Sequence, residues 1–214
     1  MRYWPLLLVI ATIVVSPAVG RAQSPVVLRP SLDGAARLAD WTVDGSGGWE
    51  IRDGLLALVK AGVPGGPIRR PAGLIILKSA PLGQVILEAE VRSDQPVDLL
   101  VRDVNLVVGW QSPTRFYYIH LAGRTDDVHN GIFLVNDADR KRLDQPTSVP
   151  QLRDQAWHRV RVERDPTSGR IAVYVDGGNV PVLQATDTTL TTGRVGVGSF
   201  DETDEFRNIT VTAR

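Results

Sequence analysis

Residues 117–130 read YYIHLAGRTDDVHN and contain two of the chain's three histidines together with two adjacent aspartates. Imidazole and carboxylate groups are common general acids and bases in enzymes. His120, His129 and Asp127 are therefore the candidate catalytic residues, with Asp127 and His129 as a candidate acid–base pair. Asp126 is more typical of a turn residue whose side chain caps backbone amides.

The strand predicted over Phe116–Ala122 has two different faces, because successive side chains of a strand point to opposite sides. Its odd-numbered residues are apolar, whereas the even-numbered ones include Tyr118 and His120. If the odd-numbered face is the core, Tyr118 and His120 lie on the other side of the sheet, where a saccharide could bind. The alternative is that these two side chains only pair across strands on a covered face.

Saccharides have apolar C–H faces that stack on aromatic rings and hydroxyl groups that need amide, imidazole or guanidinium partners. Neighbouring predicted strands offer such side chains at or near their ends. The candidate substrate-binding residues are Arg102, Trp110, Gln111, Tyr118 and Asn136.

Other acidic residues were weighed for catalysis or metal binding. Glu88 and Glu90 are same-face neighbours on a strand, at a spacing that suits a retaining glycosidase, but their strand has a clean apolar face opposite and favours a solvated sheet surface. Asp201 lies in the acidic segment DETDE and is a candidate calcium ligand, because calcium binds several oxygen donors on flexible loops. Calcium is the one cofactor hypothesis that we retain. The spacing of His120 and His129 matches no compact zinc motif.

The elements that must position these residues are short alternating segments separated by Gly, Pro, Asp and Asn, with little helical periodicity. Such a series predicts an all-β fold, a jelly-roll β-sandwich of two antiparallel sheets. The glycine- and proline-rich segment 61–71 is predicted to be a long loop. The predicted strands are 49–52, 55–60, 74–78, 84–93, 97–102, 106–111, 116–122, 131–136, 158–164, 171–175, 194–200 and 206–213.

The N-terminus is typical of a secretory signal peptide over residues 1–22, with Arg2 before an apolar run and small residues near the expected cleavage point. We therefore expect one jelly-roll domain over residues 23–214 and a secreted or periplasmic location. Removing Arg2 and Arg21 from the 24 basic residues leaves 22 against 24 acidic ones, a net charge of −2. This near-neutral balance does not favour nucleic acid as a partner.

The chain has no cysteine, so neither disulfides nor thiol chemistry can contribute. An exported chain without cysteine is typical of a bacterial protein. The apolar run of the leader is too short to cross a bilayer comfortably, so no membrane span is expected.

The segments WHRVRVERDPTSGRIAVYVDG and GRVGVGSFDETDEFRNITV resemble the closing strands of concanavalin A-like lectin/glucanase jelly rolls, which include laminin G-like domains. GWQSPTRFYYIHL and WTVDGSGGWEIRDGLLAL are similar to secreted bacterial domains of the 3-keto-disaccharide hydrolase type. The resemblance covers about residues 40–211. It implies a concanavalin A-like fold, and it leaves the activity open because the superfamily includes enzymes, lectins and adhesion modules.

Three functions remain open. The first is an enzyme that cleaves a glycosidic bond, such as that of a 3-keto-glycoside, where a histidine abstracts an acidified C–H proton. The second is a non-catalytic, lectin-like carbohydrate-binding module. The third is a structural laminin G-like adhesion domain. An oligo- or polysaccharide partner and a monomeric state are expected.

Overall fold

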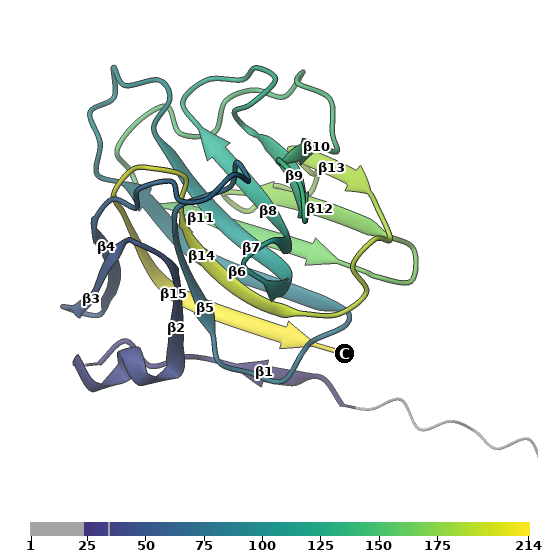
Figure 1. The fold of residues 1–214 in the computed structure, drawn as a ribbon, viewed down its shortest axis with the longest axis horizontal. Coiled ribbons are helices and arrows are strands. Elements are labelled where there is room, and N and C mark those ends of the chain that lie inside the picture. Colours follow the sequence, from purple (N-terminus) through teal and green to yellow (C-terminus); the bar gives the residue numbers. More distant parts are fainter. Residues whose placement is uncertain (1–23, 34) are drawn as a thin grey trace, which may run out of the picture.

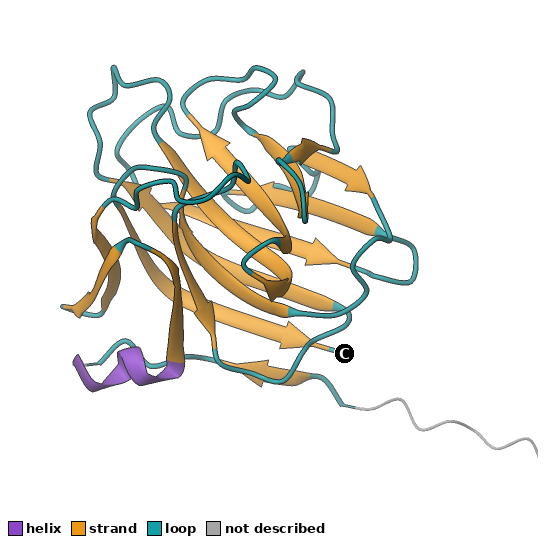
Figure 2. Cartoon of the chain, in the orientation of Figure 1, coloured by secondary structure: helices purple, strands orange, loops and turns teal. Residues whose placement is uncertain are grey.

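The computed structural model describes residues 24–33 and 35–214 as a sandwich of two antiparallel sheets (Figures 1 and 2). This confirms the predicted all-β jelly roll. The signal-peptide prediction for residues 1–22 lies outside the described residues. No helix among the described residues is long and apolar enough to cross a membrane.

Each sheet has its strands in an order far from their order in the sequence. Sheet A runs, in spatial order, through β13 (Leu183–Thr186), β12 (Arg170–Val175), β11 (His158–Arg164), β6 (Val85–Ser93), β15 (Asp204–Ala213), β4 (Leu55–Lys60) and β3 (Gly48–Arg52), with β1 (Val26–Leu28) paired to β15. Sheet B runs through β10 (Lys141–Arg142), β9 (Gly131–Asn136), β8 (Arg115–Ala122), β7 (Asp103–Ser112), β14 (Arg194–Ser199), β5 (Gly73–Leu77) and β2 (Trp41–Gly45). One 3-10 helix, η1 (Ala35–Asp40), precedes β2.

The predicted strands correspond to strands of the structure except at residues 97–102. That segment is a loop of turns, in which Leu99 N–H donates to the carbonyl of Pro96 and Arg102 N–H donates to the carbonyl of Leu99. The alternating pattern there therefore predicted the wrong structure. The turn after Asp165 does link β11 to β12 as a hairpin, as expected.

The main core lies between the two sheets, and strand β8 contributes Tyr117, Ile119 and Leu121 to it. The odd-numbered face is therefore the core face, and of the two faces that alternation defines the even-numbered one lies outward. A second apolar cluster lies on the outer face of sheet B and includes Tyr118 and Phe133 from neighbouring strands. Sheet B thus packs apolar side chains on both faces.

Two loops pack against the outer face of sheet B. Ile68, from the predicted loop 61–71, packs against the second apolar cluster. This loop is tied to the loop after β9, since Arg69 N–H donates to Asp139 Oδ1 at 2.8 Å and Arg140 N–H donates to the carbonyl of Arg69 at 3.1 Å. The strand-centre aromatic residues of β8 are covered as a result.

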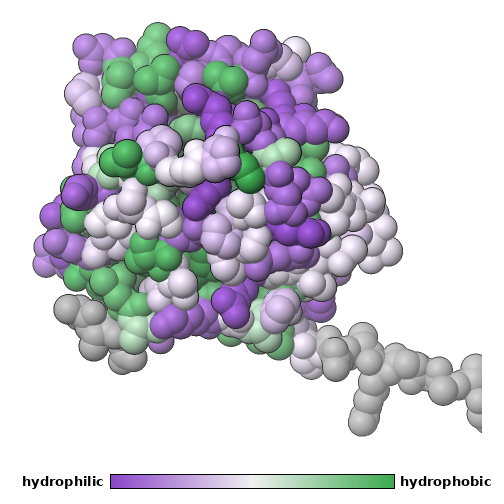
Figure 3. Space-filling view, in the orientation of Figure 1, coloured by the Kyte–Doolittle hydropathy of each residue, from purple (hydrophilic) through white to green (hydrophobic). Residues whose placement is uncertain are grey.

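The space-filling view shows how polar and apolar side chains are distributed over the described residues of one face of the molecule (Figure 3). Hydrophilic and hydrophobic residues are interspersed there, and a single apolar area does not dominate it. Scattered apolar residues are normal on soluble proteins and do not mark a binding site by themselves.

Candidate functional site

His120 lies on the outer face of β8 with a side chain that is only 2% exposed. Its ring stacks on Phe200, with centroids 5.9 Å apart and planes 14° from parallel, and also contacts the rings of Tyr118 and Phe133. An aromatic box of this kind leaves little of the imidazole accessible to a substrate. Tyr118 and His120 therefore lie on a covered face of the sheet, which was the alternative to an open saccharide-binding face.

The two ring nitrogens of His120 face groups of opposite charge. Nδ1 lies 3.5 Å from Arg140 Nη1, and Nε2 lies 3.4 Å from Asp103 Oδ2. Because a guanidinium can only donate, Nδ1 is the acceptor in its contact with Arg140, and Nε2 faces Asp103. His120 is therefore a positioning residue in the buried layer, and it is poorly placed to accept a proton from a substrate.

His129 is more accessible and is paired with an aspartate. Its Nδ1 lies 2.7 Å from Asp126 Oδ1, and its side chain is 17% exposed. The expected partner, Asp127, is exposed instead and has no hydrogen bond or ion pair with any described residue. The predicted Asp127–His129 pair is therefore wrong, and Asp126 is the acidic partner.

Asp126 also caps backbone amides of the turn, as expected from the sequence. Its Oδ1 accepts the N–H groups of Val128 and His129, and Arg124 binds its other oxygen. Burial alone would raise the pKa of Asp126, but these hydrogen bonds outweigh it and hold the pKa well below its usual range. The carboxylate is thus charged at neutral pH and fixed in position.

Burial is the largest influence on His129 and lowers its pKa, while the hydrogen bond to Asp126 opposes the shift. The net effect is a pKa below the ordinary histidine value, so the ring is neutral at pH 7. With Nδ1–H donated to Asp126, the lone pair is on Nε2. Nε2 has no hydrogen-bond partner among residues 24–33 and 35–214, so it is free to accept a proton or a hydroxyl hydrogen bond.

The rings of His120 and His129 meet edge to face, with centroids 5.5 Å apart. Arg140 lies over Phe200 at 4.3 Å from the ring centroid, and Arg69 lies over the same ring at 5.2 Å. Charged side chains from several loops therefore gather around the buried stack of His120 and Phe200.

Asp201 belongs to the same gathering. Asp201 directly follows Phe200 in the chain, and burial and then Asp103 raise its pKa, whereas His120, Arg69 and Arg140 act to lower it. We call Arg69, His129, Arg140 and Asp201 the rim. Arg69 and Asp201 are exposed, and His129 and Arg140 are half-buried.

Arg102 is a structural residue. It is fully buried, and its guanidinium donates to the carbonyls of Pro96, Val97 and Leu152 among others. These bonds join the loop before β7 to the segment near Leu152. Its predicted role in substrate binding is therefore wrong for the described conformation.

The other predicted substrate-binding residues do not form one cleft with His120. Trp110, Gln111 and Asn136 lie near the opposite end of the strands, where Arg115 of β8 pairs with both Ser112 of β7 and Asn136 of β9. Trp110 Nε1–H donates to Asp44 at 2.9 Å, and Gln111 donates to the carbonyl of Thr192 at 2.9 Å. Tyr118 is buried, and its hydroxyl accepts a hydrogen bond from Arg140 at 3.1 Å.

The acidic residues considered for metal binding or catalysis, Asp201, Glu88 and Glu90, do not form a metal site in the described part of the chain. In the part of the chain that the structure describes, no group of three or more His, Asp or Glu side chains is placed to hold a metal ion, and Asp201 is exposed on its loop. Glu88 is paired with Arg159 at 2.9 Å and Glu90 with Arg207 at 2.7 Å on the outer face of sheet A. Both glutamates therefore lie on the outer sheet face that was predicted for them, and the ion pairs are an addition that the structure makes.

Sequence reasoning missed Arg69 and Arg140, the two cations of the rim. Both lie in loops, and their proximity depends on hydrogen bonds between residues about 70 positions apart. A weak local signal was present, because IRR (residues 68–70) and DADRKR (residues 137–142) are basic segments beside predicted strands. Nothing local indicates that these two loops meet.

Comparison with known proteins gives no matching family model and no matching curated sequence. Solved structures do match, at low sequence identity. The carbohydrate binding module CBM66 from Bacillus subtilis has a TM-score of 0.63 at 14% identity, covering 81% of this chain and 96% of the module.

Two further matches are a lectin and an enzyme. The acidic lectin of winged bean, solved with methyl-alpha-D-galactose, has a TM-score of 0.58 at 12% identity and covers 89% of this chain and 98% of the lectin. The GH43 protein BlXynB from Bacillus licheniformis has a TM-score of 0.55 at 12% identity, covering 86% of this chain but 38% of that protein. Likeness at these identities concerns the fold, and the fold that it shows for this chain is the concanavalin A-like jelly roll.

Proposed function

We propose that this protein binds carbohydrate through the rim of Arg69, His129, Arg140 and Asp201. The observation that carries the proposal is the meeting of Arg69, His129 and Arg140, from separate loops, around the buried stack of His120 and Phe200, which Asp201 directly follows in the chain. Guanidinium, imidazole and carboxylate groups together supply the donors and acceptors that sugar hydroxyls require. The buried stack of His120 and Phe200 holds the rim side chains in fixed positions. This lowers the conformational entropy that they lose on binding a sugar.

Two further points support the proposal. The solved structures with this fold include a carbohydrate binding module and a lectin, so the fold suits saccharide recognition. The rim also contains both signs of charge, because Asp201 directly follows Phe200, the residue whose ring Arg69 and Arg140 cover. A mixed set favours neutral or weakly charged sugars over polyanions, which would need a basic excess.

Binding is tested by screening the purified protein on a glycan array and measuring the best ligand by calorimetry. Arg69→Ala and Asp201→Asn remove rim groups on exposed side chains, so they should weaken binding at least about tenfold without loss of folding. Arg159→Ala, on the outer face of sheet A, is the matched control and should bind as the wild type does. A protein that binds no glycan, or Arg69→Ala and Asp201→Asn variants with unchanged affinity, would contradict the proposal.

A second candidate function is cleavage of a glycosidic bond with His129 as the base. It is favoured by one specific observation, the Asp126–His129 pair, which holds Nδ1 and leaves Nε2 free on a neutral ring. In a 3-keto-glycoside the C–H beside the ketone is acidic. Nε2 would accept this proton, the electron pair would form the enolate, and expulsion of the glycosidic oxygen would complete an elimination, with Asp126 stabilising the imidazolium.

The two candidates separate in one assay with a 3-keto-glycoside as the probe. If His129 is the base, His129→Gln abolishes turnover while the glycan affinity changes little, since glutamine keeps a hydrogen-bonding side chain. Asp127→Asn is the matched control and should keep full turnover, because Asp127 lies outside the pair. Binding without turnover in the wild type supports the non-catalytic function and contradicts the cleavage hypothesis.

A further inference from the structure

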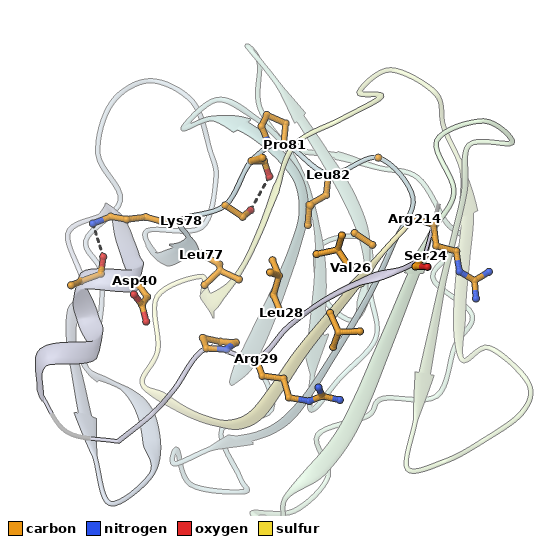
Figure 4. Close-up of a pocket in the computed structure, with 17 residues that line it drawn as sticks. Ser24, Val26, Leu28, Arg29, Asp40, Leu77, Lys78, Pro81, Leu82 and Arg214 are labelled. Carbon is orange, nitrogen blue, oxygen red and sulfur yellow. Dashed lines mark hydrogen bonds between the residues drawn. The ribbon is translucent and has the colours of Figure 1, made fainter. Parts of the chain in front are cut away.

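An apolar groove, whose lining includes no residue of the rim, lies at an edge of the sandwich (Figure 4). It is formed where β1, the end of η1, the end of β5 with the following segment 78–83, and the last two residues of the chain meet. Its volume is about 750 Å³. Pockets for small molecules typically measure about 300–1,000 Å³, so the groove is large enough for one such ligand.

The floor of the groove is apolar and continuous with the main core. Side chains of Val26, Leu28, Leu77 and Leu82 point toward the same space in Figure 4. Leu77 belongs to the core cluster, and Leu28 and Leu82 pack against it. Val26 is 56% exposed, which is a large exposure for an apolar strand residue. Covering this surface with an apolar ligand would be favourable, because it removes apolar area from water.

The charged residues that line the groove are mostly basic. Arg29, Lys78 and Arg214 line it together with a single acid, Asp40. Lys78 donates to the carbonyl of Ala39 at 2.8 Å, whereas Arg29 and Arg214 form no ion pair with any acid in the described ranges. In Figure 4 the guanidinium ends of Arg29 and Arg214 point away from the apolar side chains. The groove therefore combines an apolar interior with unpaired positive charge beside it.

We infer that this groove binds a small anionic amphiphile, a molecule with an alkyl body and a carboxylate head, such as a medium-chain fatty acid. The alkyl chain lies against Leu28, Leu77 and Leu82, and the carboxylate is within the field of Arg29 and Arg214. Guanidinium groups bind carboxylates through charge-assisted hydrogen bonds. This site is separate from the rim and does not depend on the proposed saccharide binding.

Calorimetry with decanoate, below its micelle concentration, tests the site, and decanol serves as the uncharged comparison. Decanoate should bind with one-to-one stoichiometry and at least about tenfold more tightly than decanol. Val26→Asp, which places a carboxylate in the groove, should weaken decanoate binding at least about tenfold. The double variant Arg29→Gln/Arg214→Gln should bring the affinity for decanoate down to that for decanol.

Val180→Asp is the matched control, because Val180 is 77% exposed and does not line the groove. It should bind decanoate as the wild type does, and thermal unfolding should show all variants folded. Equal binding by wild type and Val26→Asp would overturn the site, and equal binding of decanoate and decanol would overturn the anionic head group. Sedimentation that shows a dimer dissolved by Val26→Asp, with no decanoate binding, would assign the groove to a second copy of the chain instead.

Discussion

Asp126 Oδ1 lies 2.7 Å from His129 Nδ1 and accepts the backbone N–H groups of Val128 and His129 as well. One oxygen atom therefore shapes the turn before β9 and orients the imidazole at the same time. A side chain held by its own backbone and by Arg124 cannot rotate freely, so the geometry of the pair is determined by the turn.

Asp126→Asn should lower the pKa of His129 further. The carboxylate is the group that raises this pKa against burial, and an amide keeps the oxygen acceptor for the turn without the negative charge. An NMR titration of the imidazole C–H signals measures the shift directly. Asp127→Asn is the control, because Asp127 is exposed and not bonded to the ring, and an equal shift in that variant would contradict the assignment of Asp126 as the partner.

The core face of β8 could be predicted from sequence because side-chain alternation is a local property. Tyr117, Ile119 and Leu121 repeat at every second position, and all three are buried between the sheets. The same reasoning placed Tyr118 and His120 on the outer face, which is where they lie.

The cover over that outer face could not be predicted in the same way. It depends on Arg69 bonding to Asp139, and alternation contains no information about contacts between residues so far apart. The choice between Asp126 and Asp127 failed for a different reason. The backbone of a turn decides which of two adjacent side chains points inward, and the sequence TDDVHN is compatible with either.

Asp204→Asn should stabilise the protein at pH 7. Asp204 is buried, and neither carboxylate oxygen has a hydrogen bond of normal geometry among the described residues, although the nearby side chains of Ser199 and Ser93 act to lower its pKa. Burial first, and then Asp103 and Asp94, raise its pKa well above the usual value. Removing a buried acid that the fold holds against ionisation should increase the free energy of unfolding by about 1–3 kcal/mol, measured by urea unfolding.

The sign of this effect depends on pH. An acid with a raised pKa in the folded state destabilises the fold only when the unfolded chain would ionise it, so the gain from Asp204→Asn should vanish below about pH 3.9. Asp98→Asn, on an exposed side chain, is the control and should change stability little. A clear loss of stability in Asp204→Asn at pH 7 would show that the carboxylate is paired in solution.

Glu202 should make stability fall between mildly acidic and neutral pH. Burial, followed by the charges of Asp103, Asp201 and Asp94, raises its pKa from 4.5 to about 7. Its contribution to stability is fully present below about pH 4.5 and is lost as the pH rises to about 7. Thermal unfolding across this window should show a smaller decline for Glu202→Gln than for the wild type. The exposed Glu50→Gln is the control, and a decline equal to that of the wild type in Glu202→Gln would contradict the prediction.

Tyr117→Phe should destabilise the end of the sandwich where β8 meets the loop after β13. The Tyr117 hydroxyl donates to Asp187 Oδ1 at 2.5 Å and accepts the N–H of Leu190 at 3.0 Å. Burial is the main reason why the pKa of Tyr117 is raised to about 12, so the hydroxyl stays protonated and keeps donating over the whole working range of pH.

Without this hydroxyl, the buried N–H of Leu190 loses its partner, and leaving such a group unpaired costs about 1–3 kcal/mol. Urea unfolding of Tyr117→Phe should show a loss in this range. Tyr174→Phe is the matched control, because the Tyr174 hydroxyl bonds only to the side chains of Arg170 and Glu163, which water can replace. Its loss should stay below about 1 kcal/mol, and equal losses in the two variants would contradict the role given to the Leu190 N–H.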